Sequence, residues 1–327
     1  MISKHGIEGI QGITFSTDVW DEAARFYADW GLSNVAISED LQQWKTMNGA
    51  YVNVVRPNAL QYPAPIEAGP TLREVTWAVH SSKDLNELAE ILKSALNFSD
   101  QRSRGFISAQ DPMGLQIKFV VNSKIPLAIV GSASNPWGRP LRIDMASPIY
   151  PKAEPVEIGH VVLFTTQLDV MQQFYASLGF ITSDSYPGRG VFMRCAPEGG
   201  HHDLFLLQVP GKAQGLNHIA FTVRDIHEVF GGGMNMDRAG WKTQLGPGRH
   251  PISSAYFWYF ENPCGGLIEY NADEDHLTKD WQARQFEPSA TMFAEWAVDG
   301  GLDGQTRRQK TSYTPPAVTA KYITEKR

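Results

Sequence analysis

The chain has 327 residues, of which 42% are hydrophobic and 20% are charged, and its formal net charge is −6. This length favours two or three domains, and a mildly acidic chain without a basic patch argues against nucleic acid as a partner. No run of eighteen apolar residues is present, so no membrane span is expected. The two cysteines imply no disulfide framework. We therefore expect a cytoplasmic protein.

The first half of the chain predicts two strand–helix units in succession. A strand over residues 9–17 leads into a helix with apolar residues at helical spacing, and weaker strands follow to about residue 55. A second strand and helix cover residues 77–88. An Asp-Pro turn then precedes a last strand over residues 114–122. Each unit has the order βαβββ.

A proline-rich segment separates this half from a second one with the same order of elements. Its prolines remove amide donors and fix φ, which is typical of a linker laid over a surface. After Glu274 the chain becomes polar, and we expect one helix over residues 276–284 followed by an extended tail. The predicted organisation is an N-terminal domain without catalytic residues (1–122), the linker (123–156), a C-terminal domain with the candidate site (157–275), and a C-terminal helix and tail (276–327).

The two halves also match in sequence. ARFYADWGL at residues 24–32 is similar to QQFYASLGF at residues 172–180. DPMGLQIKF at residues 111–119 is similar to NPCGGLIEY at residues 262–270. Matches in the same order at separate places indicate a duplication. We therefore predict an α+β fold of four βαβββ modules, two in each half.

Three predicted strands of the second half each carry one polar residue among apolar neighbours: His160, His218 and Glu269. A buried carboxylate without a partner costs several kcal/mol, and no Lys or Arg lies in these strands to compensate it. Two imidazoles and one carboxylate suit a divalent metal ion and leave half its coordination sphere open. Polar core residues satisfied by hydrogen bonds are the alternative interpretation. The corresponding places in the first half hold Gly12, Val75 and Lys118.

The segment GRHPISSAYFWYFENPCGGLIE at residues 248–269 contains a His, a Tyr several residues later, and a polar-Pro-x-Gly turn that leads to Glu269. This pattern resembles the signature of the type I extradiol ring-cleavage dioxygenases of the vicinal oxygen chelate (glyoxalase/bleomycin resistance/dioxygenase) superfamily. Trp258 departs from it, because the family prefers an aliphatic residue before the Tyr. The resemblance covers about residues 5–275. It implies a two-domain vicinal oxygen chelate fold, with modules paired into two barrel-like domains.

The resemblance also implies roles for single residues. His160, His218 and Glu269 would be the ligands of Fe(II), with Mn(II) as the alternative ion. The first half, with Lys118 in place of the carboxylate, would hold no metal.

Three further residues are implied to act on the reactants. His202, in the segment HHDL, would be the acid–base residue that faces dioxygen, and its neighbour His201 leaves this assignment open by one residue. His250 and Tyr259 would hydrogen-bond the substrate oxygens. Arg249 is a candidate contact for a substrate carboxylate, with a solvated arginine as the alternative. Candidates for an aromatic pocket wall, or for core packing instead, are Phe205, Phe257 and Trp258.

The implied activity is extradiol cleavage of a catechol-type aromatic diol during aromatic-compound degradation. Both atoms of O2 would be inserted into the substrate. The resemblance also implies that the enzyme assembles as a homo-oligomer. A ring-cleaving dioxygenase of a para-diol, such as a gentisate or a hydroquinone, is the first alternative. A protein that binds a small molecule without catalysis is the second. A glyoxalase-type isomerase would need a fourth protein ligand, which Lys118 in the first half disfavours.

Overall fold

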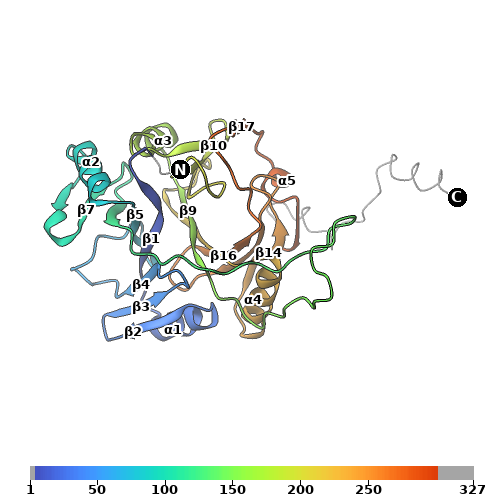
Figure 1. Ribbon diagram of the computed structural model, residues 1–327. Helices are drawn as coiled ribbons and strands as arrows, with labels where there is room; N and C mark the ends of the chain where they lie inside the picture. Colours follow the sequence, from blue (N-terminus) through green and yellow to red (C-terminus); the bar gives the residue numbers. More distant parts are fainter. Residues whose placement is uncertain (1–3, 301–327) are drawn as a thin grey trace.

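The computed structural model describes residues 4–300 and contains the four βαβββ modules that the duplication predicts (Figure 1). None of the described helices is long and apolar enough to cross a membrane. The first half comprises β1 (Ile7–Ser16), α1 (Trp20–Asp29), β2 (Ser33–Ile37), β3 (Leu41–Lys45), β4 (Tyr51–Val55), β5 (Thr71–Val79), α2 (Ser82–Leu92), β6 (Ser99–Gln101), η1 (Arg102–Arg104), β7 (Phe106–Gln110) and β8 (Gln116–Val121). The second half comprises β9 (Glu157–Phe164), α3 (Leu168–Ser177), β10 (Ile181–Tyr186), β11 (Gly190–Arg194), β12 (Leu204–Leu207), β13 (Gly215–Thr222), α4 (Ile226–Arg238), β14 (Thr243–Arg249), β15 (Tyr256–Glu261) and β16 (Leu267–Ala272).

Each half forms one mixed sheet. The first sheet has eight strands in the order β2-β3-β4-β1-β5-β8-β7-β6. The second has ten, with β17 (Arg284–Gln285) and β18 (Trp296–Asp299) at its edges, in the order β17-β10-β11-β12-β9-β13-β16-β15-β14-β18. The two modules of each half meet at an antiparallel pair, β1 with β5 and β9 with β13. This confirms the predicted α+β fold of four βαβββ modules, two in each half. The outer strands of each sheet do not pair with each other among the described residues, so the sheets are open rather than closed barrels.

The first helix of each half packs against the other half. The indole of Trp30, at the end of α1, stacks on the ring of Tyr270 with centroids 3.6 Å apart. Phe180, after α3, makes an edge contact with Trp77 at 5.0 Å. One apolar core therefore runs through both halves.

The duplicated Phe-Tyr-Ala segments make this packing reciprocal. Tyr27 in α1 donates a hydrogen bond to Asn262 in the turn before β16 (3.3 Å), and Tyr175 in α3 donates to Asp111 in the equivalent turn before β8 (3.1 Å). In both cases the tyrosine comes from one copy of the repeat and the acceptor from the other. The duplicated segments that are visible in the sequence thus also form the contact between the halves, which we call the joint.

The proline-rich segment 123–156 contains no helix or strand and runs between the two sheets and out beyond them (Figure 1). It is bound to both halves near its end, where the carbonyl of Pro155 accepts from Met47 and the amide of Val156 donates to Thr222. Ala153 is fully buried. The segment therefore connects the halves as an extended chain.

The helix expected over residues 276–284 is not formed, and that prediction is wrong. The segment is held extended by tertiary contacts: the indole of Trp281 donates to the carbonyl of Ser183, and Arg284 pairs with the buried Asp184. It continues into β17 (Arg284–Gln285), α5 (Ala290–Phe293) and β18 (Trp296–Asp299), which extend the second sheet at both ends. The tail predicted beyond residue 300 lies outside the described residues.

Candidate metal centre

The sheet register brings His160, His218 and Glu269 together. Strands β9, β13 and β16 are neighbours, and Ala220 of β13 lies opposite His160 on one side and Glu269 on the other. His218 precedes Ala220 by two residues, so its side chain leaves the same face of the sheet. The small side chain of Ala220 at the centre leaves room for the three polar groups.

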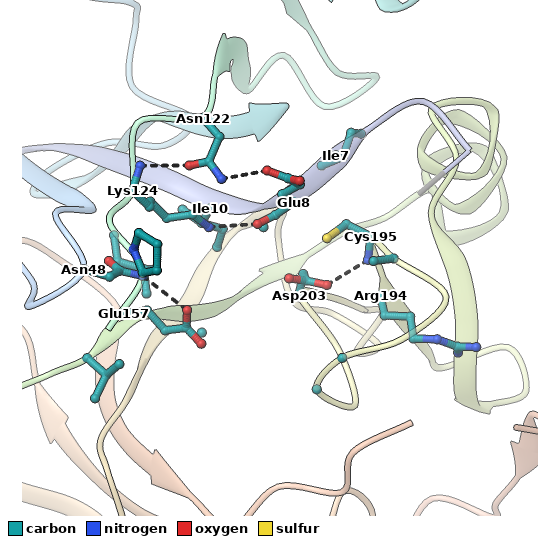
Figure 2. A pocket seen from close by; sticks show the side chains of 18 of the residues that line it. Ile7, Glu8, Ile10, Asn48, Asn122, Lys124, Glu157, Arg194, Cys195 and Asp203 are labelled. Atoms are coloured by element: carbon teal, nitrogen blue, oxygen red, sulfur yellow. Dashed lines mark hydrogen bonds between the residues drawn. The ribbon is translucent and has the colours of Figure 1, made fainter. Parts of the chain in front are cut away.

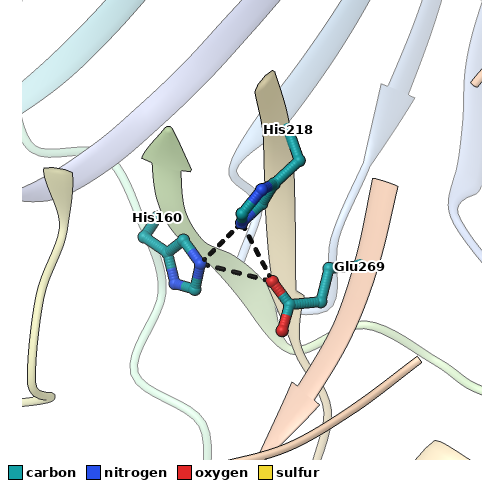
Figure 3. Close-up of side chains that lie close together, drawn as sticks. All are labelled: His160, His218 and Glu269. Atoms are coloured by element: carbon teal, nitrogen blue, oxygen red, sulfur yellow. Dashed lines mark hydrogen bonds and ion pairs between the residues drawn. The ribbon is translucent and has the colours of Figure 1, made fainter. Parts of the chain in front are cut away.

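The three donor atoms converge on one point (Figure 3). The Nε2 atoms of His160 and His218 are 3.2 Å apart, and they lie 3.3 and 3.1 Å from Oε2 of Glu269. Donors that lie about 2.1 Å from one shared ion, at right angles to each other, are themselves about 3 Å apart. All three side chains are buried, and no Lys or Arg pairs with Glu269 among the described residues. The donor set therefore fits a divalent metal ion.

Neighbouring groups prepare these residues for coordination. Nδ1 of His218 lies 2.6 Å from Oδ1 of Asn217, to which it donates, so that the lone pair of Nε2 points to the shared centre. Burial lowers the pKa of His218, which favours the neutral imidazole that a metal needs. Burial opposes ionisation of Glu269, but its contacts with His160, His218 and His250 outweigh this effect and hold its pKa well below the usual range.

The doublet His201-His202 lies just before β12, and its two rings have different surroundings. The ring of His202 lies 4.1 Å from that of His160 and lines the cavity above the donor atoms. Burial and the nearby imidazoles hold the pKa of His202 well below its ordinary value. The ring of His201 is fully buried away from the cavity, with Nε2 3.0 Å from Asp184. A carboxylate oxygen of Glu274 lies 3.1 Å from Nδ1 of His202.

His250 and Tyr259 form a hydrogen-bonded pair beside the donor atoms. Nδ1 of His250 is 2.6 Å from the carbonyl oxygen of Phe293, which fixes it as the donor, and Nε2 then accepts from the Tyr259 hydroxyl at 3.1 Å. Tyr259 lies opposite Glu269 in the register of β15 and β16. Burial and the charge of Glu269 raise the pKa of Tyr259 well above its usual value, so it stays a neutral hydroxyl.

A cavity of about 570 Å³ opens above these groups. Of the three aromatic candidates from the sequence, Phe205 lines it, whereas Phe257 stacks on His250 at 4.1 Å and Trp258 packs in the main core. Phe192 stacks on Phe205 at 3.9 Å and was not singled out by the sequence. The remaining apolar walls come mostly from segments distant in the chain: Val162, Phe164, Tyr186, Leu207, Val209, Ile252, Met292 and Phe293.

The first half holds no equivalent centre among its described residues. There Gly12 and Lys118 both lie opposite Thr76, as His160 and Glu269 lie opposite Ala220. The equivalent of His218 is therefore Glu74, two residues before Thr76, and the expected Val75 is wrong by one residue. The sequence alone could not fix this register, because loops of different length separate the matched segments of the two halves. The ring of Tyr51 fills the space that a side chain at Gly12 would enter.

A second cavity of about 710 Å³ lies at the junction of the halves and the linker (Figure 2). Its polar side chains bind each other and the backbone: Lys124 donates to the carbonyl of Glu8, and Asn48 donates to Glu157. Asp203 accepts from the amide of Cys195. None of the groups of metal-ligating side chains found in residues 4–300 lies in this cavity. The candidate site is therefore the cavity above His160.

The fold and the site define a protein of paired βαβββ modules. Its second pair holds two groups of potential ligands among the described residues, which share His160: the buried His160, His218 and Glu269, and His160, His202 and the partly exposed Glu274. Residues 157–270 match the model of the Glyoxalase/Bleomycin resistance protein/Dioxygenase superfamily. The matched segment contains His160, His218 and Glu269, so this similarity agrees with the resemblance that the motifs indicated.

Comparisons with single proteins agree with this assignment. Metapyrocatechase 2 of Cupriavidus necator is 32% identical over 181 residues, which are 54% of this chain and 54% of that protein, so the match spans about half the length of this relative. A solved Mn(II)-bound glyoxalase from Novosphingobium aromaticivorans has a TM-score of 0.71 at 22% identity, covering 95% of this chain and 96% of that one. Homoprotocatechuate 2,3-dioxygenase from Arthrobacter globiformis has a TM-score of 0.69 at 17% identity, covering 94% and 92%. The two structures show a shared fold.

Proposed function

We propose that the chain is an Fe(II)-dependent extradiol dioxygenase that cleaves a catechol-type aromatic diol with O2, and that its first half is scaffold. The observation that carries the proposal is the convergence of His160, His218 and Glu269, of which the two histidines line one aromatic-walled cavity. The similarity to Metapyrocatechase 2 supports this activity over others found in the superfamily. Mn(II) is the alternative ion.

The ion would be held by the two Nε2 atoms and Oε2, and when bound it would supply adjacent open positions for the diol and O2 and lower the pKa of the diol hydroxyls. The neutral Tyr259 hydroxyl has one proton, which would turn from Nε2 of His250 to a deprotonated diol oxygen when substrate binds. His250, fixed by the carbonyl of Phe293, would position that hydroxyl. The stacked rings of Phe192 and Phe205 would hold the substrate ring and exclude water.

His202 is placed to move a proton during ring cleavage. Its ring lies beside His160 on the wall of the cavity, and its pKa is lowered by burial, so the neutral imidazole accepts a proton from a reactant and returns it. A positioned acid–base group of this kind contributes about 10²- to 10⁴-fold to a rate. His201, which is buried against Asp184, would hold the backbone of His202 in place.

The test is oxygen consumption by anaerobically purified, Fe(II)-loaded protein with a panel of catechols, gentisates and hydroquinones. We expect uptake with catechols and a coloured ring-opened product. Uptake with gentisate or hydroquinone alone would establish the para-diol alternative instead. Tight binding of diols without oxygen uptake would show that the protein binds a small molecule and does not catalyse its cleavage.

Metal analysis tests the ligand set independently of activity. The purified protein should contain about one iron per chain, and His218→Ala should lose it. His227→Ala, a histidine on α4 outside the cavity, is the matched control and should retain it. Full iron content in His218→Ala would refute the assignment.

A further inference from the structure

The cavity above the candidate metal centre has a marked charge asymmetry. At its base lie the imidazoles of His160 and His218, and its middle is apolar and aromatic. Among residues 4–300, the permanently charged residues that line it are two exposed cations, Arg189 and Lys212, whereas Glu269 is fully buried and does not line it. This is unexpected for a chain with a net charge of −6.

The two cations lie on one rim of the cavity because their loops are adjacent. Arg189 lies in the turn between β10 and β11, and Lys212 lies in the loop between β12 and β13. The amide of Gln208, at the start of that loop, donates a 2.6 Å hydrogen bond to the carbonyl of Arg189. Strand pairing of β11 with β12 holds the two loops together.

Neither cation is neutralised by a carboxylate of the described residues. Among residues 4–300, no carboxylate forms an ion pair with Arg189 or Lys212. The ammonium of Lys212 lies 4.8 Å from the centre of the Phe164 ring, which also lines the cavity, so the charge is held over an apolar wall. In contrast, Arg249, the cation next to His250, pairs with Glu295 and does not line the cavity.

We infer that the substrate is an aromatic diol with an apolar extension that ends in a carboxylate, and that Arg189 and Lys212 bind this carboxylate. The inference rests on the proposed function, which places the diol at His160, His218 and Glu269. A cavity of about 570 Å³ lies within the range that holds ligands larger than one ring. Its apolar middle suits the extension, and paired cations suit a carboxylate.

The test compares catechols that carry ω-carboxyalkyl chains of increasing length with their methyl esters. These pairs differ in charge and keep the diol and the chain. Dissociation constants are measured under nitrogen, and kcat/KM is measured in air. For at least one chain length, the native protein should bind and cleave the acid on the order of tenfold better than the ester. The double variant Arg189→Met/Lys212→Met should lose this preference and keep its activity with the ester.

A matched control removes two cations elsewhere. Arg238 and Lys242 lie outside the cavity, and Arg238→Met/Lys242→Met changes the net charge equally. It should keep the preference for the acid. If the acids and esters bind equally at every chain length, or if both double variants lose the preference alike, the inference is refuted.

The two proposals fail separately in this experiment. Preferential binding of an acid without ring cleavage would leave the carboxylate site standing and refute the dioxygenase activity. Cleavage of acids and esters at equal rates would refute the carboxylate site and leave the dioxygenase activity standing.

Discussion

The hydroxyl of Tyr175 donates a hydrogen bond of 3.1 Å to Oδ2 of Asp111, a fully buried carboxyl group in the other half of the chain. Oδ1 of Asp111 accepts from the amides of Met113 and Leu115. Burial raises the pKa of Asp111 to about 6 in spite of these hydrogen bonds. The joint between the halves therefore contains a carboxyl group that binds a proton more tightly in the folded chain than in the unfolded one.

This relationship predicts a pH-dependent stability. Because the folded pKa is raised from the ordinary value of 3.8, the contribution is full below that value and is lost as the pH rises through about 6. Asp111→Asn should remove this dependence. Relative to that variant, we expect the free energy of unfolding of the native chain to fall by roughly 2–3 kcal/mol across this window.

Urea denaturation at intervals between pH 4 and pH 7 measures the effect. Asp169→Asn, which alters an exposed carboxylate on α3, should keep the native slope. Equal slopes in the native chain and Asp111→Asn would contradict the prediction.

Asn217 should control the affinity for metal without being a ligand. Its Oδ1 holds Nδ1 of His218, so Asn217→Ala frees the ring to rotate and to change tautomer. Loss of such a partner lowers metal affinity by about 10- to 100-fold. Competition with a chelator measures this change. Asn217→Asp, which keeps the acceptor, should retain most of the affinity, and equal retention by the Ala variant would contradict the role.

The two adjacent histidines should give different defects. His202→Phe should keep iron and stability but lower turnover by about 10²-fold or more, because the proton-transfer group is lost. His201→Phe should lower the free energy of unfolding by about 1–3 kcal/mol, because Asp184 loses a buried hydrogen-bond partner while Arg284 still pairs with it. Turnover per folded, iron-loaded chain and urea denaturation separate the two effects. An intact fold with impaired turnover in His201→Phe would reverse the assignment.

Gly12 and Tyr51 should be energetically coupled. Gly12→Ala places a methyl group against the ring of Tyr51 and should destabilise the chain by about 1–3 kcal/mol. In a Tyr51→Ala background the same substitution should cost less than about 0.5 kcal/mol. A double-mutant cycle by urea denaturation measures the difference. Additive effects would show that Tyr51 does not close the space above Gly12.

Sequence reasoning reached those features that depend on local pattern and repetition. The four modules followed from the duplicated segments, and three polar residues in apolar strands indicated where ligand atoms would meet. The sequence placed Val75, instead of Glu74, at the position equivalent to His218, because the local pattern does not fix the register of a strand. Loops of different length separate the matched segments of the two halves, so the offset between them changes along the chain, and only the register with β1 and β8 identifies Glu74 as the residue on the site face.

Features that depend on distant contacts were not accessible in the same way. Arg249 was a candidate because it adjoins His250, but its pairing with Glu295 depends on how the C-terminal segment folds back. That segment was expected to be helical at residues 276–284, yet Asp184 and Ser183 hold it extended so that Met292 and Phe293 reach the cavity. No local signal reports such contacts.

The stacking of Trp30 on Tyr270 also bears on how the two halves depend on each other. A polypeptide of half this length would expose the aromatic face of its first helix to water, and it would lack an acceptor for the tyrosine of its Phe-Tyr-Ala segment. Two copies that exchange these contacts would bury the aromatic face and supply the hydrogen-bond acceptor. Each half thus completes the fold of the other, and the first half supports the site in the second through these shared contacts.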